Sequence, residues 1–139
     1  LAADNGLADA SGWCPVDQQT FASTLQPDIH VIGDAAIAGA MPKSGYSANS
    51  QGKVCAMAVA AAINGESPPA PSYVNTCYSI LAPGHGISVA GVYELKDGEI
   101  VSVPGAGGLS SPDADARTRA IEVQFALDWY RNITADMFT

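Results

Sequence analysis

The pattern of apolar and polar positions predicts little regular structure in the first part of the chain. Residues 1–26 mix small, polar and turn-forming side chains without a helical or strand period. The apolar run "PDIHVIGD" at 27–34 starts at a proline and ends at Gly33, which predicts a short strand. The glycine- and proline-rich stretch 35–47 predicts a loop. The strand is therefore expected to end in a Gly-Asp pair followed by small residues.

The alanine-rich stretch 46–63 predicts a helix, and Asn64 and Gly65 are typical of a helix C-terminus. Its small side chains allow other backbone to approach closely on several sides. This composition suits a helix that is buried between layers.

The remaining half of the chain predicts a hairpin and a second helix. A proline-rich linker at 67–72 leads to two strands over 87–95 and 99–103, joined by the Asp97-Gly98 pair that favours a type I′ turn. The glycine-rich stretch 105–115 predicts a loop.

A helix is then predicted over 113–135, rich in aromatic and aliphatic side chains. Ser111 and Pro112 are the expected N-cap and first helical residue. We therefore expect a mixed α+β fold.

Composition limits the partners of the chain. The net charge of −8 argues against nucleic acid and anionic lipid, and the longest apolar run, at 54–63, is too short to span a bilayer. Charged residues make up only 14% and hydrophobic residues 47%. This indicates a chain that hides much of its surface against other protein, although an alanine-rich, self-sufficient domain has a similar composition. The absence of an initiator Met suggests a processed or truncated product.

Cysteine and histidine spacing predicts no metal site. Cys14, Cys55 and Cys77 are too far apart for a CxxC motif, and their odd number leaves at least one without an internal disulfide partner. His30 and His85 stand alone, so no ligand pair has metal-binding spacing.

The Gly33-Asp34 pair is a candidate ligand site. Small residues beside it allow a ligand to contact backbone, and the Asp34 carboxylate can accept hydrogen bonds from a ribityl or ribose hydroxyl. The N–H groups from Ala35 onward could face phosphate oxygens. An ordinary Asx turn has the same sequence, so both interpretations stay open.

The start of the alanine-rich helix is a second candidate. Lys43, Ser44 and Gly45 precede it, and a helix N-terminus offers unpaired N–H donors and partial positive charge. Such a terminus would stabilise an anionic reduced flavin. Lys43 taken alone is equally typical of a solvated surface.

Two long stretches carry a resemblance to a known family. "HVIGDAAIAGAMPKSGYSANSQGKV" (30–54) and "PSYVNTCYSILAPGHGISVAGVYEL" (71–95) resemble the C-terminal part of the flavoprotein subunit of flavocytochrome c sulfide dehydrogenase, and the similarity continues to "FALDWYRNITADMF" (125–138). That family belongs to the glutathione-reductase-like flavoproteins with two dinucleotide-binding domains and is related to sulfide:quinone oxidoreductase. The resemblance implies that 1–66 ends the FAD-binding domain and that 67–139 forms a C-terminal flavin-binding and interface domain.

The resemblance also implies roles for individual residues. Asp34 matches the aspartate that holds the ribityl chain, Cys77 one of two redox cysteines beside the flavin, and Trp129 an aromatic residue close to the flavin ring. Packing alone would equally explain a cysteine or a tryptophan at these positions. The implied flavin-binding set is Gly33, Asp34, Ala35, Lys43, Ser44, Gly45, Tyr46 and Trp129.

One departure from the family is large. The GxGxxG fingerprint of the first FAD-binding segment is missing, since "GAGGLS" (105–110) lacks the last glycine and the strand–helix context. The covalent flavin attachment cysteine and the partner of Cys77 are therefore expected outside this chain, which resembles the C-terminal third of the enzyme.

The resemblance implies a periplasmic enzyme that oxidises sulfide and passes electrons through FAD to haem c on a c-type cytochrome subunit. A quinone-reducing relative and a non-catalytic interaction module are the alternatives.

Overall fold

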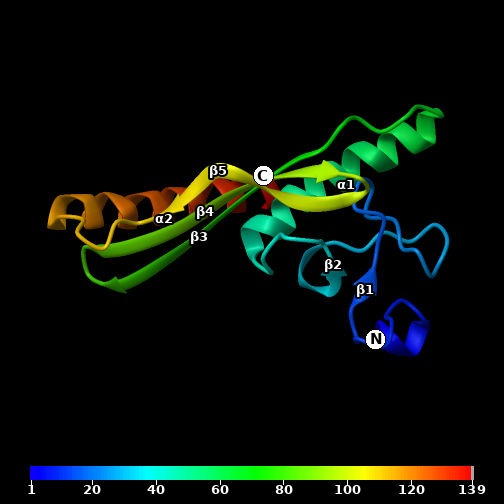
Figure 1. Cartoon of the computed structure of the whole chain (residues 1–139), viewed down its shortest axis with the longest axis horizontal. Helices are drawn as coiled ribbons and strands as arrows, with labels where there is room; N and C mark the ends of the chain where they lie inside the picture. Colours follow the sequence, from blue (N-terminus) through cyan, green and yellow to red (C-terminus); the bar gives the residue numbers. More distant parts are fainter. Residues whose placement is uncertain (139) are drawn as a thin grey trace. The chain divides into compact units, whose positions relative to one another are not determined.

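The computed structural model describes residues 1–138 as a mixture of short helices, two long helices and strands (Figure 1). The elements in chain order are η1 (Ala3–Asn5), β1 (Cys14–Pro15), η2 (Gly33–Ala35), β2 (Ala36–Ile37), α1 (Gly45–Asn64), β3 (Ser72–Ala82), β4 (His85–Lys96), β5 (Glu99–Leu109) and α2 (Ala116–Phe138). β1 and β2 pair in parallel, with Cys14 opposite Ala36. The expected α+β class is confirmed, whereas the organisation into two dinucleotide-binding domains stays a prediction.

β3, β4 and β5 form a three-stranded sheet in that order. Only two residues connect each pair of neighbouring strands, so the strands run antiparallel. The φ angles of Asp97 (53°) and Gly98 (86°) are both positive, as a type I′ turn requires. The hairpin predicted at this pair is confirmed.

Two features of this sheet differ from the sequence prediction. β3 was not predicted as a strand, and β5 continues through Leu109 where a loop was expected. Gly107 explains the second difference: a Cβ added to it would lie 2.4 Å from the Ala90 carbonyl oxygen. The glycine therefore allows β5 to lie against β4, whereas in the sequence it has the appearance of a loop residue.

The strand predicted over 27–34 is wrong. This stretch makes only an isolated bridge between Ala22 and His30, and residues from Gly33 onward form the 3₁₀ turn η2. Pro27 and Asp28 lie in a turn, in which Asp28 adopts a left-handed conformation (φ 60°). The stretch after it pairs with residues 21–23 only around that bridge, through Ser23 N to Ile29 O (2.7 Å) and Val31 N to Phe21 O (2.9 Å). The loop predicted over 35–47 is interrupted by β2 and by the first residues of α1.

α1 confirms the helix predicted over 46–63. Ser44 is its N-cap and accepts a hydrogen bond from Ser47 N (3.1 Å). At the other end Gly65 has φ 69°, and its N–H faces the last carbonyl groups. Only one side of the helix is buried, since Met57 and Ile63 on other sides are exposed.

α2 begins later than expected, and the predicted N-cap is wrong. Ser111 and Pro112 belong to a turn that precedes the helix, in which Ala114 N donates to Ser111 O. The cap is Asp115, whose Oδ1 accepts from Thr118 N at 2.8 Å. These hydrogen bonds hold the pKa of Asp115 below its usual value.

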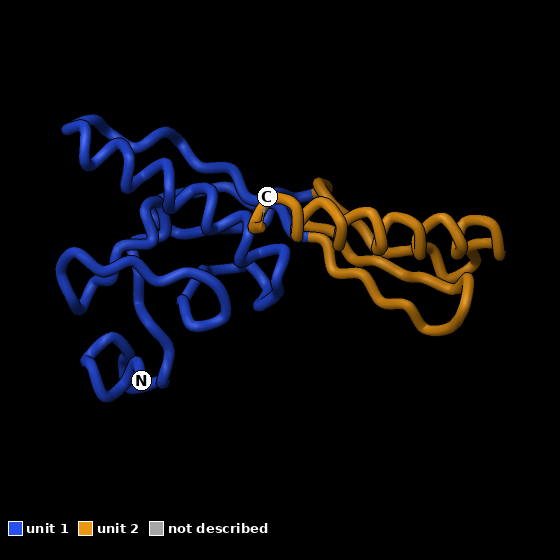
Figure 2. Tube along the Cα trace, turned by 180° about the vertical axis from the view of Figure 1, so that it is seen from behind, with its two compact units in different colours: residues 1–75, 92–104 blue, residues 76–91, 105–139 orange. Residues whose placement is uncertain are grey.

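The chain divides into two compact units (Figure 2). Unit 1 comprises residues 1–75 and 92–104. Gln18 ties its segments together: its carbonyl oxygen accepts from Tyr73 Oη (2.6 Å) and its Oε1 from Ile100 N (2.6 Å). The buried core consists of Val16, Phe21, Ala36, Ala38, Met41, Val54, Tyr73, Tyr93 and Ile100.

Unit 2 comprises residues 76–91 and 105–138. Here α2 buries Arg119, Ala126 and Ile133, which are spaced seven residues apart and so share one stripe. β4 approaches the helix at Gly86, where an added Cβ would lie 2.7 Å from Val123 N. The division at residue 66 inferred from the family concerns the domains of a longer flavoprotein and stays a prediction.

Within residues 1–138, no helix combines the length and apolar character needed to cross a membrane.

Candidate functional site

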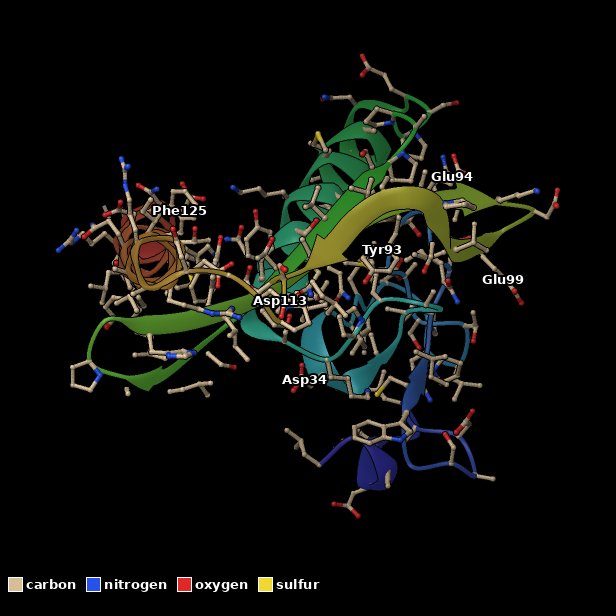
Figure 3. All side chains as sticks on the ribbon, turned by 60° about the vertical axis from the view of Figure 1, so that its left-hand side comes forward. Asp34, Tyr93, Glu94, Glu99, Asp113 and Phe125 are labelled. Carbon is tan, nitrogen blue, oxygen red and sulfur yellow. The ribbon has the colours of Figure 1, made fainter. Side chains whose placement is uncertain are left out.

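A cleft of about 170 Å³ opens in unit 1 where η2, β2 and the start of α1 meet. Figure 3 shows Asp34 on the η2 side of this region. The cleft wall consists of small residues, larger apolar residues and a few polar side chains. They are Trp13, Gly33, Asp34, Ala36, Ile37, Ala38, Gly39, Met41, Pro42, Lys43, Ser47 and Gln51. The structure thus brings Gly33, Asp34 and Lys43 of the predicted set to one cleft, and their role in binding a cofactor stays a prediction.

The η2 turn presents backbone and carboxylate to the cleft. Gly33 has φ 73°, a conformation that favours glycine, although a Cβ there would meet only Ala48 at an ordinary 3.5 Å. The Gly33 N–H donates to Gln51 Oε1 (2.7 Å). Asp34 and Ala35 follow with exposed side chains. Conformation rather than lack of space therefore requires the glycine.

The exposed Lys43 side chain contacts two other residues of the cleft wall. Its Nζ is 3.6 Å from the centroid of the Trp13 ring and donates to the Asp34 carbonyl oxygen. A cation over an indole face is held by the ring quadrupole. Trp13 was not predicted as a site residue, and no local signal in the sequence connects it with Lys43.

The start of α1 contributes differently from what the motif suggested. The Ser44 hydroxyl caps the helix and donates to Asn75 Oδ1 (2.5 Å). The buried Ser47 hydroxyl donates to the same oxygen atom (3.1 Å). The Ser44 hydroxyl therefore has no proton left to donate to a ligand and keeps only one acceptor lone pair. Gly45 has open space around it, and Tyr46 is half-buried.

Gln51 is a wall residue that sequence reasoning missed. It is 2% exposed and comes from the second turn of α1. The signal available in the sequence was a polar amide at the start of an otherwise alanine-rich run.

Cys77 and Trp129 belong to unit 2. The ring of Trp129 packs against Tyr78 with centroids 6.0 Å apart. Since neighbouring side chains of a strand point to opposite faces, Cys77 faces away from the side of β3 on which Tyr78 meets α2. The structure places these two predicted residues in one unit but on different faces of the sheet.

The three cysteines differ in environment. Within residues 1–138 none forms a disulfide: Cys14 is buried, and Cys55 and Cys77 are half-buried. Burial raises the pKa of the Cys55 thiol, which makes it a poorer nucleophile at neutral pH. Among the described residues, no three His, Cys, Asp or Glu side chains are placed to hold a metal ion.

The donor set of the cleft fits part of a flavin nucleotide. A carboxylate suits sugar hydroxyls, backbone N–H groups and a lysine suit anionic oxygens, and the apolar wall suits a ring. A cleft of this volume can hold only a portion of such a cofactor.

The comparison with known proteins identifies the class as a flavin-binding part of a flavoenzyme. The family model described as "Flavocytochrome c sulphide dehydrogenase, flavin-binding" matches residues 69–138, half of the chain. The chain belongs to this family, which confirms the resemblance found in the sequence. The matched range contains β3, β4, β5 and α2, with Cys77 and Trp129, whereas the cleft residues precede it.

Proposed function

We propose that this chain supplies part of the FAD site and one redox cysteine of an enzyme that oxidises sulfide and passes the electrons to a c-type cytochrome subunit. The match of residues 69–138 to the sulphide dehydrogenase family is the observation that carries this proposal. The family name itself joins a flavin, a c-type cytochrome and sulfide.

In this proposal the cleft of unit 1 holds part of the cofactor. Asp34 accepts a hydrogen bond from a cofactor hydroxyl, and the backbone around Gly33, Ala35 and Gly45 approaches its polar atoms. Lys43 supplies positive charge at the mouth of the cleft. When bound, FAD accepts two electrons and releases them one at a time.

Cys77 is proposed to take up the sulfur atom. Hydrosulfide attacks a disulfide between Cys77 and a second cysteine of the whole enzyme; a new S–S bond forms on Cys77, and the second cysteine leaves as a thiolate. Re-formation of the disulfide releases zero-valent sulfur, one proton and two electrons, for which the bound FAD would be the acceptor. The sum is the two-electron oxidation of HS⁻ to S⁰ and H⁺.

The electrons are then proposed to reach haem c on the cytochrome subunit in the periplasm. The sequence net charge of −8 would favour association with a partner that presents basic groups.

Rapid mixing of the FAD-loaded enzyme with sulfide tests this proposal. Cys77→Ser should keep FAD bound but lose sulfide-dependent bleaching of the flavin, because serine forms neither a disulfide nor a persulfide. Cys55→Ser is the matched control and should reduce the flavin at the wild-type rate. Normal bleaching in Cys77→Ser would contradict the role of this cysteine.

A further inference from the structure

The buried Gln51 amide has a defined orientation in the cleft wall. The Gly33 backbone N–H points at one end of the amide at 2.7 Å, and only an oxygen atom can accept from it. Oε1 must therefore face Gly33, which leaves the NH₂ group at the other end.

The NH₂ group of Gln51 is poorly satisfied. Its nitrogen lies 3.8 Å from Met41 Sδ, and a thioether is a weak acceptor. Within residues 1–138, Nε2 has no hydrogen-bond partner besides this sulfur. An amide nitrogen carries two N–H donors, and a donor that is buried without an acceptor costs folding free energy. A group this deeply buried (2% exposed) is therefore expected to have an acceptor that is not part of these residues.

We propose that Gln51 is a cofactor-contacting residue: its Nε2 donates a hydrogen bond to an oxygen atom of the flavin cofactor in the cleft, while its Oε1 holds the Gly33 turn. This inference rests on the proposed function, since it takes the flavin to occupy this cleft. One side chain would then couple the left-handed Gly33 conformation to the presence of the ligand.

The substitution Gln51→Glu separates the two roles of the amide. Glutamate keeps an acceptor for Gly33 N but, when ionised, has no donor for the cofactor. The FAD dissociation constant of the whole flavoprotein, measured by absorbance titration at neutral pH, should rise about two- to tenfold, the usual range for one hydrogen bond. Below about pH 4, under the ordinary glutamate pKa of about 4.3, the difference from wild type should shrink, because a protonated carboxyl group donates again.

Two comparisons make the result specific. Besides the introduced glutamate, the cleft wall carries the charged groups of Asp34 and Lys43. Because their charges are present in both proteins, the dissociation constant of the variant is compared with that of the wild type at each pH. Gln19→Glu makes the same chemical change outside the cleft wall and should leave the dissociation constant unchanged.

A measurement on the wild-type protein covers the case in which Gln51→Glu does not fold. The side-chain ¹⁵N–H signals of Gln51, assigned by their absence in Gln51→Met, should shift when FAD is added. Unshifted signals, or wild-type affinity of Gln51→Glu at every pH, would overturn the inference. If Asp34→Ala weakens FAD binding in that case, only the role of Gln51 is wrong; if Asp34→Ala also binds normally, the proposed cleft is wrong as well.

Discussion

Asp34 contributes two different groups to the cleft. Its carbonyl oxygen accepts from Lys43 Nζ, whereas its carboxylate is exposed and left for other partners. Lys43 is fixed at the same time by the face of Trp13. The positive charge of Lys43 is thus held by a backbone and a ring contact, and the Asp34 carboxylate keeps its capacity to accept.

We expect Asp34→Ala to weaken FAD binding. The substitution removes an acceptor for a desolvated hydroxyl, a loss of about 1–3 kcal/mol, or roughly five- to 150-fold in the dissociation constant. Asp113→Ala, at an exposed position before α2 (Figure 3), is the control. An unchanged FAD content of purified Asp34→Ala would remove this carboxylate from the site.

The elements were predictable where local signals decide the structure. α1 follows from its alanine content and its cap residues, and the β4–β5 turn from the Asp97-Gly98 pair. Gly107 misled the prediction because its closeness to Ala90 is set by a neighbouring strand. The extended stretch before η2 was predicted as a strand from its apolar residues, but it finds a partner only at the single bridge between Ala22 and His30.

The contribution of the α1 N-cap to the free energy of unfolding should be measurable. Ser44→Ala removes the acceptor for Ser47 N and a contact with Asn75, which predicts a loss of about 1 kcal/mol in urea denaturation. Ser67→Ala, in the exposed linker after α1, should change the unfolding midpoint little. Equal midpoints for the two variants would show that this cap is unimportant.

The cap of α2 should depend on pH. Hydrogen bonds from the start of the helix lower the pKa of Asp115 in the folded state, so its contribution is complete above the ordinary aspartate pKa of about 3.9 and is lost as the pH falls through the lower, folded-state value. Asp115→Asn keeps a capping oxygen but cannot titrate. Wild type should therefore lose more stability than Asp115→Asn between pH 5 and 2 in thermal melts, and parallel curves would contradict this assignment.

Many large apolar side chains of the described residues are exposed. α2 buries one stripe yet exposes Ile121, Phe125 and Tyr130 on its flanks (Figure 3 labels Phe125). A helix with apolar residues on most sides is typical of one that is covered in a larger assembly. This agrees with the low fraction of charged residues in the sequence.

The chain purified on its own should self-associate through such surfaces. Phe125→Ser removes a ring that is 55% exposed and should lower the apparent mass in sedimentation experiments at high protein concentration. Val123→Ser, at a half-buried position on the same helix, is expected to cost stability instead. Monomeric wild-type protein at these concentrations would argue against the prediction.

The site was predictable only in its contiguous parts. The segments around Asp34 and Lys43 are recognisable because each carries its signal within a few residues. Trp13 and Gln51 join the cleft through contacts with distant segments, to Lys43 and to Gly33 respectively. No periodicity or motif encodes these two contacts, so they require the folded chain.

The two hydrogen bonds of Gln18 have a consequence for the order of events during synthesis. Ile100 lies 82 residues after Gln18, and Tyr73 lies 55 residues after it. A ribosome releases the loop around Gln18 long before it releases β5. The loop therefore cannot form both hydrogen bonds until Tyr73 and Ile100 have been synthesised. Contacts of such sequence separation close late and slow folding. Unit 1, which contains the cleft, can therefore gain these two hydrogen bonds only after β5 has been synthesised.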